Sequence, residues 1–251
     1  MRIAALFLLP DCDLACRFCA SEFGLDSLTE DEAIRWIGSV AAKRYTSVVL
    51  GGGEPLLWSG DLFRVGARAK ELGLVVQLNT NGVAWREEVE TSKSIDRVIL
   101  PLDGATHTTH DFLRGRRKGH RALVEDRLRR LSVVGREVTI GSVICRLNSA
   151  DLPAIAEELA ERVEAGLRLH AWHLYRFQPI GRGGGAIGRN EELGLGVGEY
   201  LHVCKPIQSV SRSWKIYRRP DMTRSKDVDF FWKEKGQWRA QGRGLFTKIA
   251  S

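Results

Sequence analysis

The stretch RIAALFLLPDCDLACRFC, residues 2–19, joins an apolar segment to three closely spaced cysteines. A short apolar run of this kind is typical of a buried β-strand, and Cys12, Cys16 and Cys19 form a CxxxCxxC triplet directly after it. Three thiolates on one loop can hold one corner of a soft-metal centre, and three ligands rather than four leave one metal position free. The stretch therefore predicts a strand followed by a reactive metal centre.

A structural zinc site and a lipoprotein signal are alternative explanations of the triplet. Structural zinc takes four protein ligands, but the other two cysteines, Cys145 and Cys204, stand alone without a CxxC or HxxxH partner. A lipoprotein signal would keep an apolar run up to its acceptor, Cys16, but Asp11 and Asp13 interrupt that run. Both alternatives are disfavoured on these grounds.

A second motif, GGGEP at residues 51–55, follows an apolar run at residues 48–50. Glycines without side chains let the backbone approach a ligand closely, and Glu54 adds an acceptor. A dinucleotide-binding GxGxxG loop fails at Leu56, and no GK[ST] completes a phosphate loop. The motif therefore indicates a ligand-binding turn at the end of a strand, with a plain glycine turn as the alternative.

The two motifs, their order, and Phe18 just before the third cysteine resemble the radical S-adenosylmethionine (radical SAM) superfamily. The resemblance implies a 4Fe–4S cluster and S-adenosylmethionine as cofactors, with the latter bound to the fourth iron. Within the superfamily, the layout is most similar to small single-cluster members, namely viperin-type nucleotide dehydratases and the barrel of the molybdopterin-precursor cyclase. The implied cluster ligands are Cys12, Cys16 and Cys19.

The same resemblance implies further contacts to S-adenosylmethionine. The glycine run corresponds to the segment that binds its amino group, and residues 79–82 resemble the TNG turn of the family. The segment at residues 101–103 resembles the family's SLD, with Pro101 in place of the serine. Turn formation and helix capping are the alternative roles of these polar residues. The implied cofactor-binding residues are Gly52, Gly53, Glu54, Asn79, Asn81, Asp103 and Ser142.

Short β-branched runs alternate with helical patterns along the chain, as in repeated βα units. The predicted strands are residues 3–9, 47–50, 75–79, 97–102, 137–144 and 169–177. The predicted helices are residues 30–44, 62–72, 86–93, 121–134 and 152–165, with Thr29 and Asp151 as caps. We therefore expect an α/β fold, a partial (β/α)6 TIM-like barrel that is laterally open, with its site at the carboxyl ends of the strands. The expected divisions are a core at residues 1–180, a glycine-rich loop or lid at 181–198 and a small basic extension at 199–251 that closes the barrel.

The charge of the chain is unevenly distributed. Residues 1–204 carry 26 Lys and Arg against 27 Asp and Glu, a net charge of −1, whereas residues 205–251 carry 12 against 4, a net charge of +8. This extension has strand-like pieces at 214–217 and 229–238, with a turn at Lys235-Gly236, so we expect it to be folded and to favour an anionic substrate or partner. No membrane span is evident, and the five cysteines without an export signal indicate a reducing compartment, the cytoplasm.

Three further features have open interpretations. Residues 181–198 hold eight glycines and two arginines, which suits a mobile lid that binds phosphates or a flexible linker. His107, His110 and Asp111 have the spacing of a metal patch but lack a further ligand, so a solvated helix start is favoured. A basic cluster could turn one arginine towards the site; it comprises Arg114, Arg116, Arg117, Lys118 and Arg121. Cys145 and Cys204 are predicted to be buried thiols.

The sequence thus predicts an enzyme that reductively cleaves S-adenosylmethionine to a 5′-deoxyadenosyl radical and abstracts hydrogen from a small anionic, phosphorylated or nucleotide-like substrate. A reductant such as flavodoxin or ferredoxin is the expected partner. Modification of a peptide or protein is the alternative within the superfamily. An iron–sulfur module that binds nucleic acid through Trp214, Tyr217, Trp232 and Trp238 is a disfavoured alternative of another class.

Overall fold

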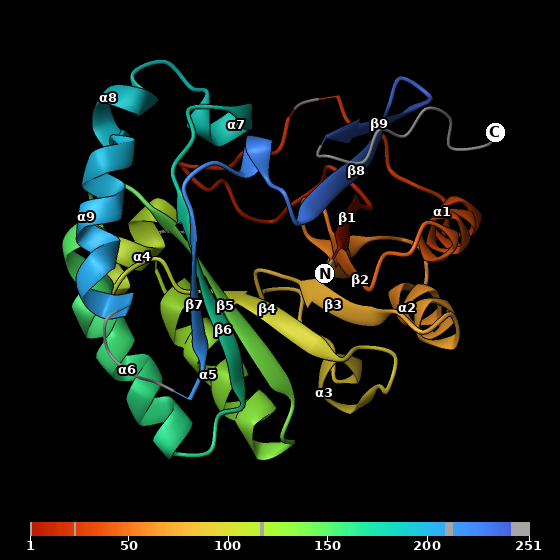
Figure 1. The fold of residues 1–251 in the computed structure, drawn as a ribbon, viewed down its shortest axis with the longest axis horizontal. Helices are drawn as coiled ribbons and strands as arrows, with labels where there is room; N and C mark the ends of the chain where they lie inside the picture. Colours follow the sequence, from red (N-terminus) through yellow and green to blue (C-terminus); the bar gives the residue numbers. More distant parts are fainter. Residues whose placement is uncertain (1, 23, 116–117, 209–212, 242–251) are drawn as a thin grey trace.

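The computed structural model describes residues 2–22, 24–115, 118–208 and 213–241. Within them lies one nine-stranded sheet in the order β7-β6-β5-β4-β3-β2-β1-β8-β9, with helices packed along its outer side (Figure 1). The central strands are β1 (Ile3–Phe7), β2 (Ser47–Gly51), β3 (Val75–Asn79), β4 (Arg97–Pro101), β5 (Glu137–Ile144) and β6 (Leu169–Arg176). Neighbours among these six strands pair in parallel. The prediction of an open, partial barrel of six parallel strands is confirmed.

Helices connect these strands as expected for βα units. They are α1 (Glu30–Ala42), α2 (Leu62–Glu71), α3 (Glu88–Thr91), α4 (His107–Leu113), α5 (His120–Val133) and α6 (Leu152–Glu164). Thr29 caps α1 in a capping box with Glu32, as predicted. Asp151 does not cap α6 through its side chain, because its Oδ2 accepts a hydrogen bond from the backbone of Ala105 at 2.8 Å. No helix in the described part of the chain is both long and apolar enough to cross a membrane.

The C-terminal part of the chain extends both edges of the sheet. It comprises α7 (Gly181–Gly184), α8 (Arg189–Leu193), α9 (Val197–Gln208), β7 (Lys215–Arg219), β8 (Val228–Glu234) and β9 (Gln237–Gln241). β7 pairs in parallel with β6, β8 pairs in parallel with β1, and β9 is antiparallel to β8. In the described ranges no strand pair joins the two ends of the sheet, and the closure of the barrel by residues 199–251 stays a prediction. The predicted turn is confirmed, because Lys235 and Gly236 both have positive φ and connect β8 to β9.

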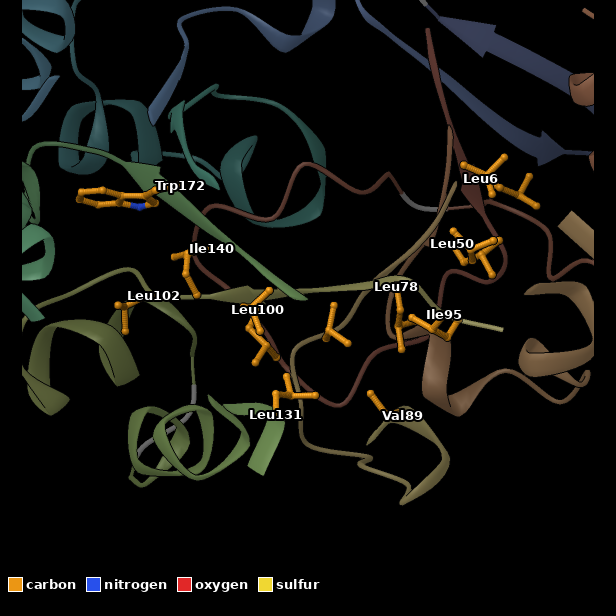
Figure 2. Packing of buried hydrophobic residues seen from close by; sticks show 14 of the residues in the cluster. Leu6, Leu50, Leu78, Val89, Ile95, Leu100, Leu102, Leu131, Ile140 and Trp172 are labelled. Atoms are coloured by element: carbon orange, nitrogen blue, oxygen red, sulfur yellow. The ribbon is translucent and has the colours of Figure 1, made fainter. Parts of the chain in front are cut away.

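The two faces of the sheet differ in chemistry. Alternate side chains of the central strands, such as Leu50, Leu78 and Ile140, point to the outer side and are fully buried under the helices (Figure 2). The residues between them, such as Gln77 and Thr139, face the inner side and include polar groups. The inner face is thus the one on which the sheet can present chemistry.

The amino-terminal part of the inner face is filled by a polar network. The Arg97 guanidinium donates to Glu137 at 2.8 Å and to Gln77 at 3.3 Å. The amide of Gln77 in turn donates to the hydroxyl of Ser47 at 2.8 Å. These side chains satisfy one another, so the groups left for a ligand lie nearer the carboxyl ends of the strands, where parallel barrels place their sites.

Candidate cofactor site

The cysteine loop leaves the end of β1 and lies directly against the GGGEP run at the end of β2. The backbone amides of Gly53 and Glu54 donate to the carbonyl oxygens of Leu9 and Asp11, each at 2.7 Å. Gly52 has φ +135°, and a Cβ there would lie 2.6 Å from the carbonyl oxygen of Leu9. The glycines are therefore required where two backbones touch. Contact of Gly52, Gly53 and Glu54 with S-adenosylmethionine remains a proposal.

Two other glycine-bearing segments press on the same loop. Gly115, with φ +65° after α4, would place a Cβ 2.7 Å from the carbonyl carbon of Ala15. A Cβ on Gly183 in α7 would lie 2.6 Å from the backbone nitrogen of Cys19. The amides of Gly183 and Gly184 donate to the Cys19 carbonyl at 3.0 and 3.1 Å. The start of the glycine-rich segment is thus packed on the cysteine loop, which neither the lid nor the linker interpretation anticipated.

Each cysteine of the triplet has a polar neighbour from a different segment. The side-chain amide of Asn81, after β3, lies 3.6 Å from the sulfur of Cys12. The guanidinium of Arg114, after α4, lies 3.8 Å from the sulfur of Cys16. Arg182, in α7, donates to the Pro10 carbonyl at 2.9 Å; burial lowers its pKa, but the neighbouring Cys19 raises it above the usual value. These donors suit thiolates that carry negative charge as metal ligands.

At least two of the three sulfurs lie farther apart than the ligands of a single zinc ion. A tetrahedral zinc with bonds of about 2.3 Å brings its sulfurs to about 3.8 Å from one another. In the described residues, three possible metal-binding atoms lie within 4.8 Å of one another at His110, Asp111 and His120, and not at the cysteines. Burial raises the pKa of the Cys16 thiol to about 11, against the charge of Arg114, which lowers it. Cationic iron would therefore have to supply the compensation that keeps this ligand a thiolate.

Glu54 joins the glycine run to the turn after β3. Its buried carboxylate accepts hydrogen bonds from the Thr80 hydroxyl at 2.6 Å, the Asn81 amide at 2.7 Å and the Leu56 amide at 3.1 Å. Burial raises its pKa to about 7, while these three donors favour the charged form and lower it. The predicted acceptor is thus engaged within the protein and fixes the turn that carries Asn81.

The other predicted cofactor contacts have different positions. Asp103 is fully buried and accepts hydrogen bonds from Arg114 Nε at 2.6 Å and from the Val143 amide at 2.7 Å. Ser142 points to the outer side, where its hydroxyl accepts a hydrogen bond from Trp172 Nε1 at 2.8 Å and donates to the Leu102 carbonyl. Asn79 is exposed at the end of β3, beside Gly51. Asn79 is thus exposed at the strand end, and the buried Asn81 lies beside Cys12. Asp103 supports Arg114, and Ser142 lies away from the inner face.

The segment with His107, His110 and Asp111 begins α4, as favoured, but His110 and Asp111 are buried rather than solvated, and His110 belongs to a chain of hydrogen bonds. The amide of Asp103 donates to His110 Nδ1 at 3.0 Å, so His110 Nε2 carries the hydrogen that faces His120 Nδ1 at 2.8 Å. His120 Nε2 then donates to the Asn81 carbonyl at 2.9 Å. Asp111 accepts from the Gly119 and Arg121 amides, and His107 does not join the group. The ring nitrogens are committed to these bonds, so we do not assign a metal here.

One arginine of the predicted basic cluster lies at the cysteines, together with an arginine that was not predicted there. Arg114 is the member that reaches the cysteines, whereas Arg121 is buried in ion pairs with Glu125 and Glu158. Arg116 and Arg117 lie outside the described residues. Arg182 was not predicted as a partner of the triplet, although a lone arginine among glycines after a strand end was a usable signal. Cys145 and Cys204 are buried thiols, as predicted.

Comparison with known proteins extends these observations. The sequence profile of the Radical SAM superfamily matches residues 6–159, which is more than half of the chain. The AdoMet-dependent heme synthase of Methanosarcina barkeri is 34% identical over 121 residues, 45% of this chain and 34% of that protein. The S-adenosylmethionine-dependent nucleotide dehydratase of Lacinutrix mariniflava is 26% identical over 161 residues, 57% of this chain and 33% of that protein. The matches thus cover about a third of the length of these curated relatives.

Among solved structures, Streptococcus suis SuiB bound to S-adenosylmethionine has a TM-score of 0.69 at 15% identity, covering 86% of this chain and 50% of SuiB. SuiB bound to the precursor peptide SuiA has a TM-score of 0.64 at 16% identity, covering 85% and 48%. Identities this low show the shared fold alone. The profile match spans the cysteine loop, the glycine run and the strands β2 to β5, and the chain therefore belongs to the radical SAM superfamily, whose enzymes use a 4Fe–4S cluster and S-adenosylmethionine.

Proposed function

We propose that this enzyme abstracts a hydrogen atom from a small anionic substrate, phosphorylated or nucleotide-like, after reductive cleavage of S-adenosylmethionine. The observation that carries the proposal is where the positive charge lies. Residues 205–251 hold a net charge of +8, and this segment supplies β7 beside β6 and β8 beside β1. Within the described residues, β7 carries Lys215, Arg218 and Arg219 and no acidic residue, whereas β8 carries Asp229, Lys233 and Glu234. The excess on these strands therefore lies at the β7 edge of the sheet. The nucleotide dehydratase among the relatives supports the same substrate class.

The chain's own residues would position and shield the cofactors in this reaction. Cys12, Cys16 and Cys19 would hold the cluster, which together with S-adenosylmethionine supplies the one-electron cleavage to methionine and a 5′-deoxyadenosyl radical. Arg114 and Arg182 place positive charge at two of the three sulfurs. Gly115 and Gly183 pack against the backbone of the loop at Ala15 and Cys19 and would hold it in place.

The test is the stimulation of 5′-deoxyadenosine formation by candidate substrates. The protein is reconstituted anaerobically with iron and sulfide, reduced with dithionite and supplied with S-adenosylmethionine. Each of the four nucleoside triphosphates is added separately, and 5′-deoxyadenosine is quantified by chromatography. We expect one nucleotide to raise the rate at least tenfold. A flat response to every nucleotide would contradict the proposed substrate class, and the absence of any 5′-deoxyadenosine from fully loaded protein would contradict the reaction itself.

A peptide or protein is a second candidate substrate. The solved structure of SuiB with a precursor peptide favours it at the level of fold, and β9 (Gln237–Gln241) ends the described sheet with an edge to which an extended peptide could add. If synthetic peptides raise 5′-deoxyadenosine formation and nucleotides do not, this candidate replaces the first.

One of the four aromatic residues named for nucleic-acid binding is not accessible. Trp214 is buried and packs on Trp172 with ring centroids 6.4 Å apart, so it cannot stack on bases. The proposed electron donor, a flavodoxin or ferredoxin, can be tested by replacing dithionite with either reduced protein in the same assay.

A further inference from the structure

Strands β6 and β7 place a set of polar and aromatic side chains on one stretch of the inner face. β6 and β7 pair in parallel register, His173 with Tyr217 and Tyr175 with Arg219. Paired residues share a face, and Trp172 and Leu174 between them are buried on the outer side. His173, Tyr175, Tyr217 and Arg219 therefore point inward, towards the carboxyl ends of the strands.

The guanidinium of Arg219, at the end of β7, has a donor that no described residue accepts from. Its side chain is 16% exposed, and its Nε is buried without a hydrogen-bond partner among the described residues. Its ion pair with Asp227 is long, at 3.5 Å, and the Asp227 side chain is 58% exposed. The guanidinium carbon lies 5.2 Å from the centroid of the Tyr217 ring, which holds the plane of the guanidinium in place. A buried donor without an acceptor is destabilising, so an anion that accepts from Nε would relieve the deficit.

Neighbouring groups add hydrogen-bonding capacity without adding negative charge. His173 packs on Tyr217 with ring centroids 5.0 Å apart, and its Nδ1 lies 3.3 Å from the Tyr175 hydroxyl. Burial, and then the charge of Arg219, lowers the pKa of His173 to about 3, so the ring is neutral at pH 7. The site thus offers one cation, neutral polar groups and aromatic ring faces.

Aromatic side chains also face inward from the strands at the other side of the sheet. Phe7 on β1 and Phe230 on β8 contact each other with ring centroids 6.4 Å apart, and both are partly exposed. Phe231, the neighbour of Phe230, packs on Trp36 of α1 on the outer side, which confirms the orientation of Phe230. Apolar ring surface therefore also lies on the inner face at β1 and β8, six and seven strands from β7 in the sheet order. The rings on the same stretch as Arg219 are those of Tyr217, His173 and Tyr175, which suit a planar ligand.

We propose that Arg219, beside Tyr217, binds the anionic group of a planar-ringed substrate whose ring packs on the inward-facing aromatic side chains of β6 and β7. This assignment rests on the proposed function, because it names the groups that select the substrate of the same reaction. The shared ligand chemistry is a phosphate or a carboxylate attached to an aromatic ring. A nucleotide and an aromatic carboxylic acid are its two sources.

The test measures equilibrium binding to the reconstituted enzyme with S-adenosylmethionine present and no reductant. One arm titrates the four nucleoside triphosphates by calorimetry, and the other titrates benzoate and 2-naphthoate. The variants are Arg219→Met and Arg219→Lys. The control is Arg218→Met, because Arg218 is the neighbouring residue on β7, is exposed and points to the opposite face. Thermal unfolding of every variant shows whether it is folded.

We expect probes of one arm to bind and Arg219→Met to weaken that binding about 10- to 100-fold, the effect of one charged hydrogen-bonding partner. Arg219→Lys keeps the positive charge but loses the planar guanidinium, so its affinity should lie between those of the unchanged protein and of Arg219→Met. The affinity of Arg218→Met should stay within about twofold of that of the unchanged protein. The arm that binds identifies the source of the anion. Binding by neither arm, or equal binding by the Arg219→Met and Arg218→Met variants, would overturn the assignment. These binding results are read without turnover, so they are distinguishable from a failure to form 5′-deoxyadenosine.

Discussion

Replacing Gly183 with alanine tests whether the glycine segment fixes the cysteine loop. The new Cβ would lie 2.6 Å from the backbone nitrogen of Cys19 and nearer still to the carbonyl oxygen of Cys16. Ordinary Cβ contacts begin at 3.4 Å, so the Cys19 nitrogen alone would have to move by about 0.8 Å, the difference between 3.4 and 2.6 Å. Gly183 does not have positive φ, so the close contact and not backbone strain carries the effect.

The displaced atoms belong to Cys16 and Cys19, two of the three proposed cluster ligands. They are held in place by the hydrogen bonds from Gly183 and Gly184 to the Cys19 carbonyl, so the loop cannot yield without losing these bonds. Overpacking of a close-packed contact destabilises by about 1–3 kcal/mol. In a domain of this size, that corresponds to a fall in Tm of about 2–12 °C. We expect this fall together with fewer than four irons per chain after anaerobic reconstitution, measured by colorimetric iron and sulfide assays.

Gly198→Ala is the matched control. Gly198 lies in α9 without positive φ, and a Cβ there meets no atom within 4 Å. Alanine in an exposed helical position should leave iron content unchanged and raise stability by up to about 1 kcal/mol. If the Gly183→Ala variant keeps the Tm and the iron content of this control, the packing argument is refuted. If only its Tm falls, the segment stabilises the fold but does not fix the cluster ligands.

Three shorter predictions concern buried polar groups. Glu54→Gln would turn an amide N–H towards one of the three donors that now bond to the carboxylate. We expect it to lower the free energy of unfolding by about 1–3 kcal/mol in urea titrations, and an unchanged value would contradict this. Arg114→Met would leave Asp103 without its buried partner and lower the free energy of unfolding by about 3–5 kcal/mol. Where the cluster still assembles, loss of the positive charge should shift the reduction potential of the cluster to a more negative value in a redox titration. Because the pKa of His173 lies at about 3 in the folded chain and near 6.5 when unfolded, its contribution to stability is present above pH 6.5 and lost as pH falls towards 3. His173→Gln should therefore reduce the pH slope of the free energy of unfolding by up to about 1.4 kcal/mol per unit between pH 6 and pH 4, whereas the exposed His202→Gln should not.

Local patterns predicted the central strands because each is a short apolar run with turn residues after it. β3 (Val75–Asn79) and β5 (Glu137–Ile144) have the predicted bounds. The pairing of the C-terminal strands could not be predicted in this way. β7 (Lys215–Arg219) and β8 (Val228–Glu234) join opposite edges of the sheet, and the choice of edge depends on pairing with strands distant in sequence. The sequence therefore indicated strands in the tail but not what they pair with.

The candidate site shows the same division between local and long-range information. The cysteine triplet is contiguous and could be read directly, whereas the contacts of Gly115 and Gly183 with the loop join segments far apart in the chain. The outward position of Ser142 was available from the sequence. It alternates in step with Ile140 and Ile144, so the period of a strand places its hydroxyl on their side, among the helices. The family resemblance implied a contact of Ser142 with S-adenosylmethionine, whereas the strand period predicts the outer side. The structure agrees with the period.

The histidine chain explains why two separate contacts to the cysteine loop belong to one framework. Asp103 holds Arg114 near Cys16, and its amide fixes the ring of His110. Through His120 the chain ends on the carbonyl of Asn81, whose side chain lies beside Cys12. Every proton position along it is determined by the amide at its start, and burial lowers the pKa of His110, so both rings can serve as neutral, directional links. A shift of either turn would thus misplace the donors at both sulfurs. The buried histidines are better understood as the joint between the two sides of the cluster loop than as a second metal site.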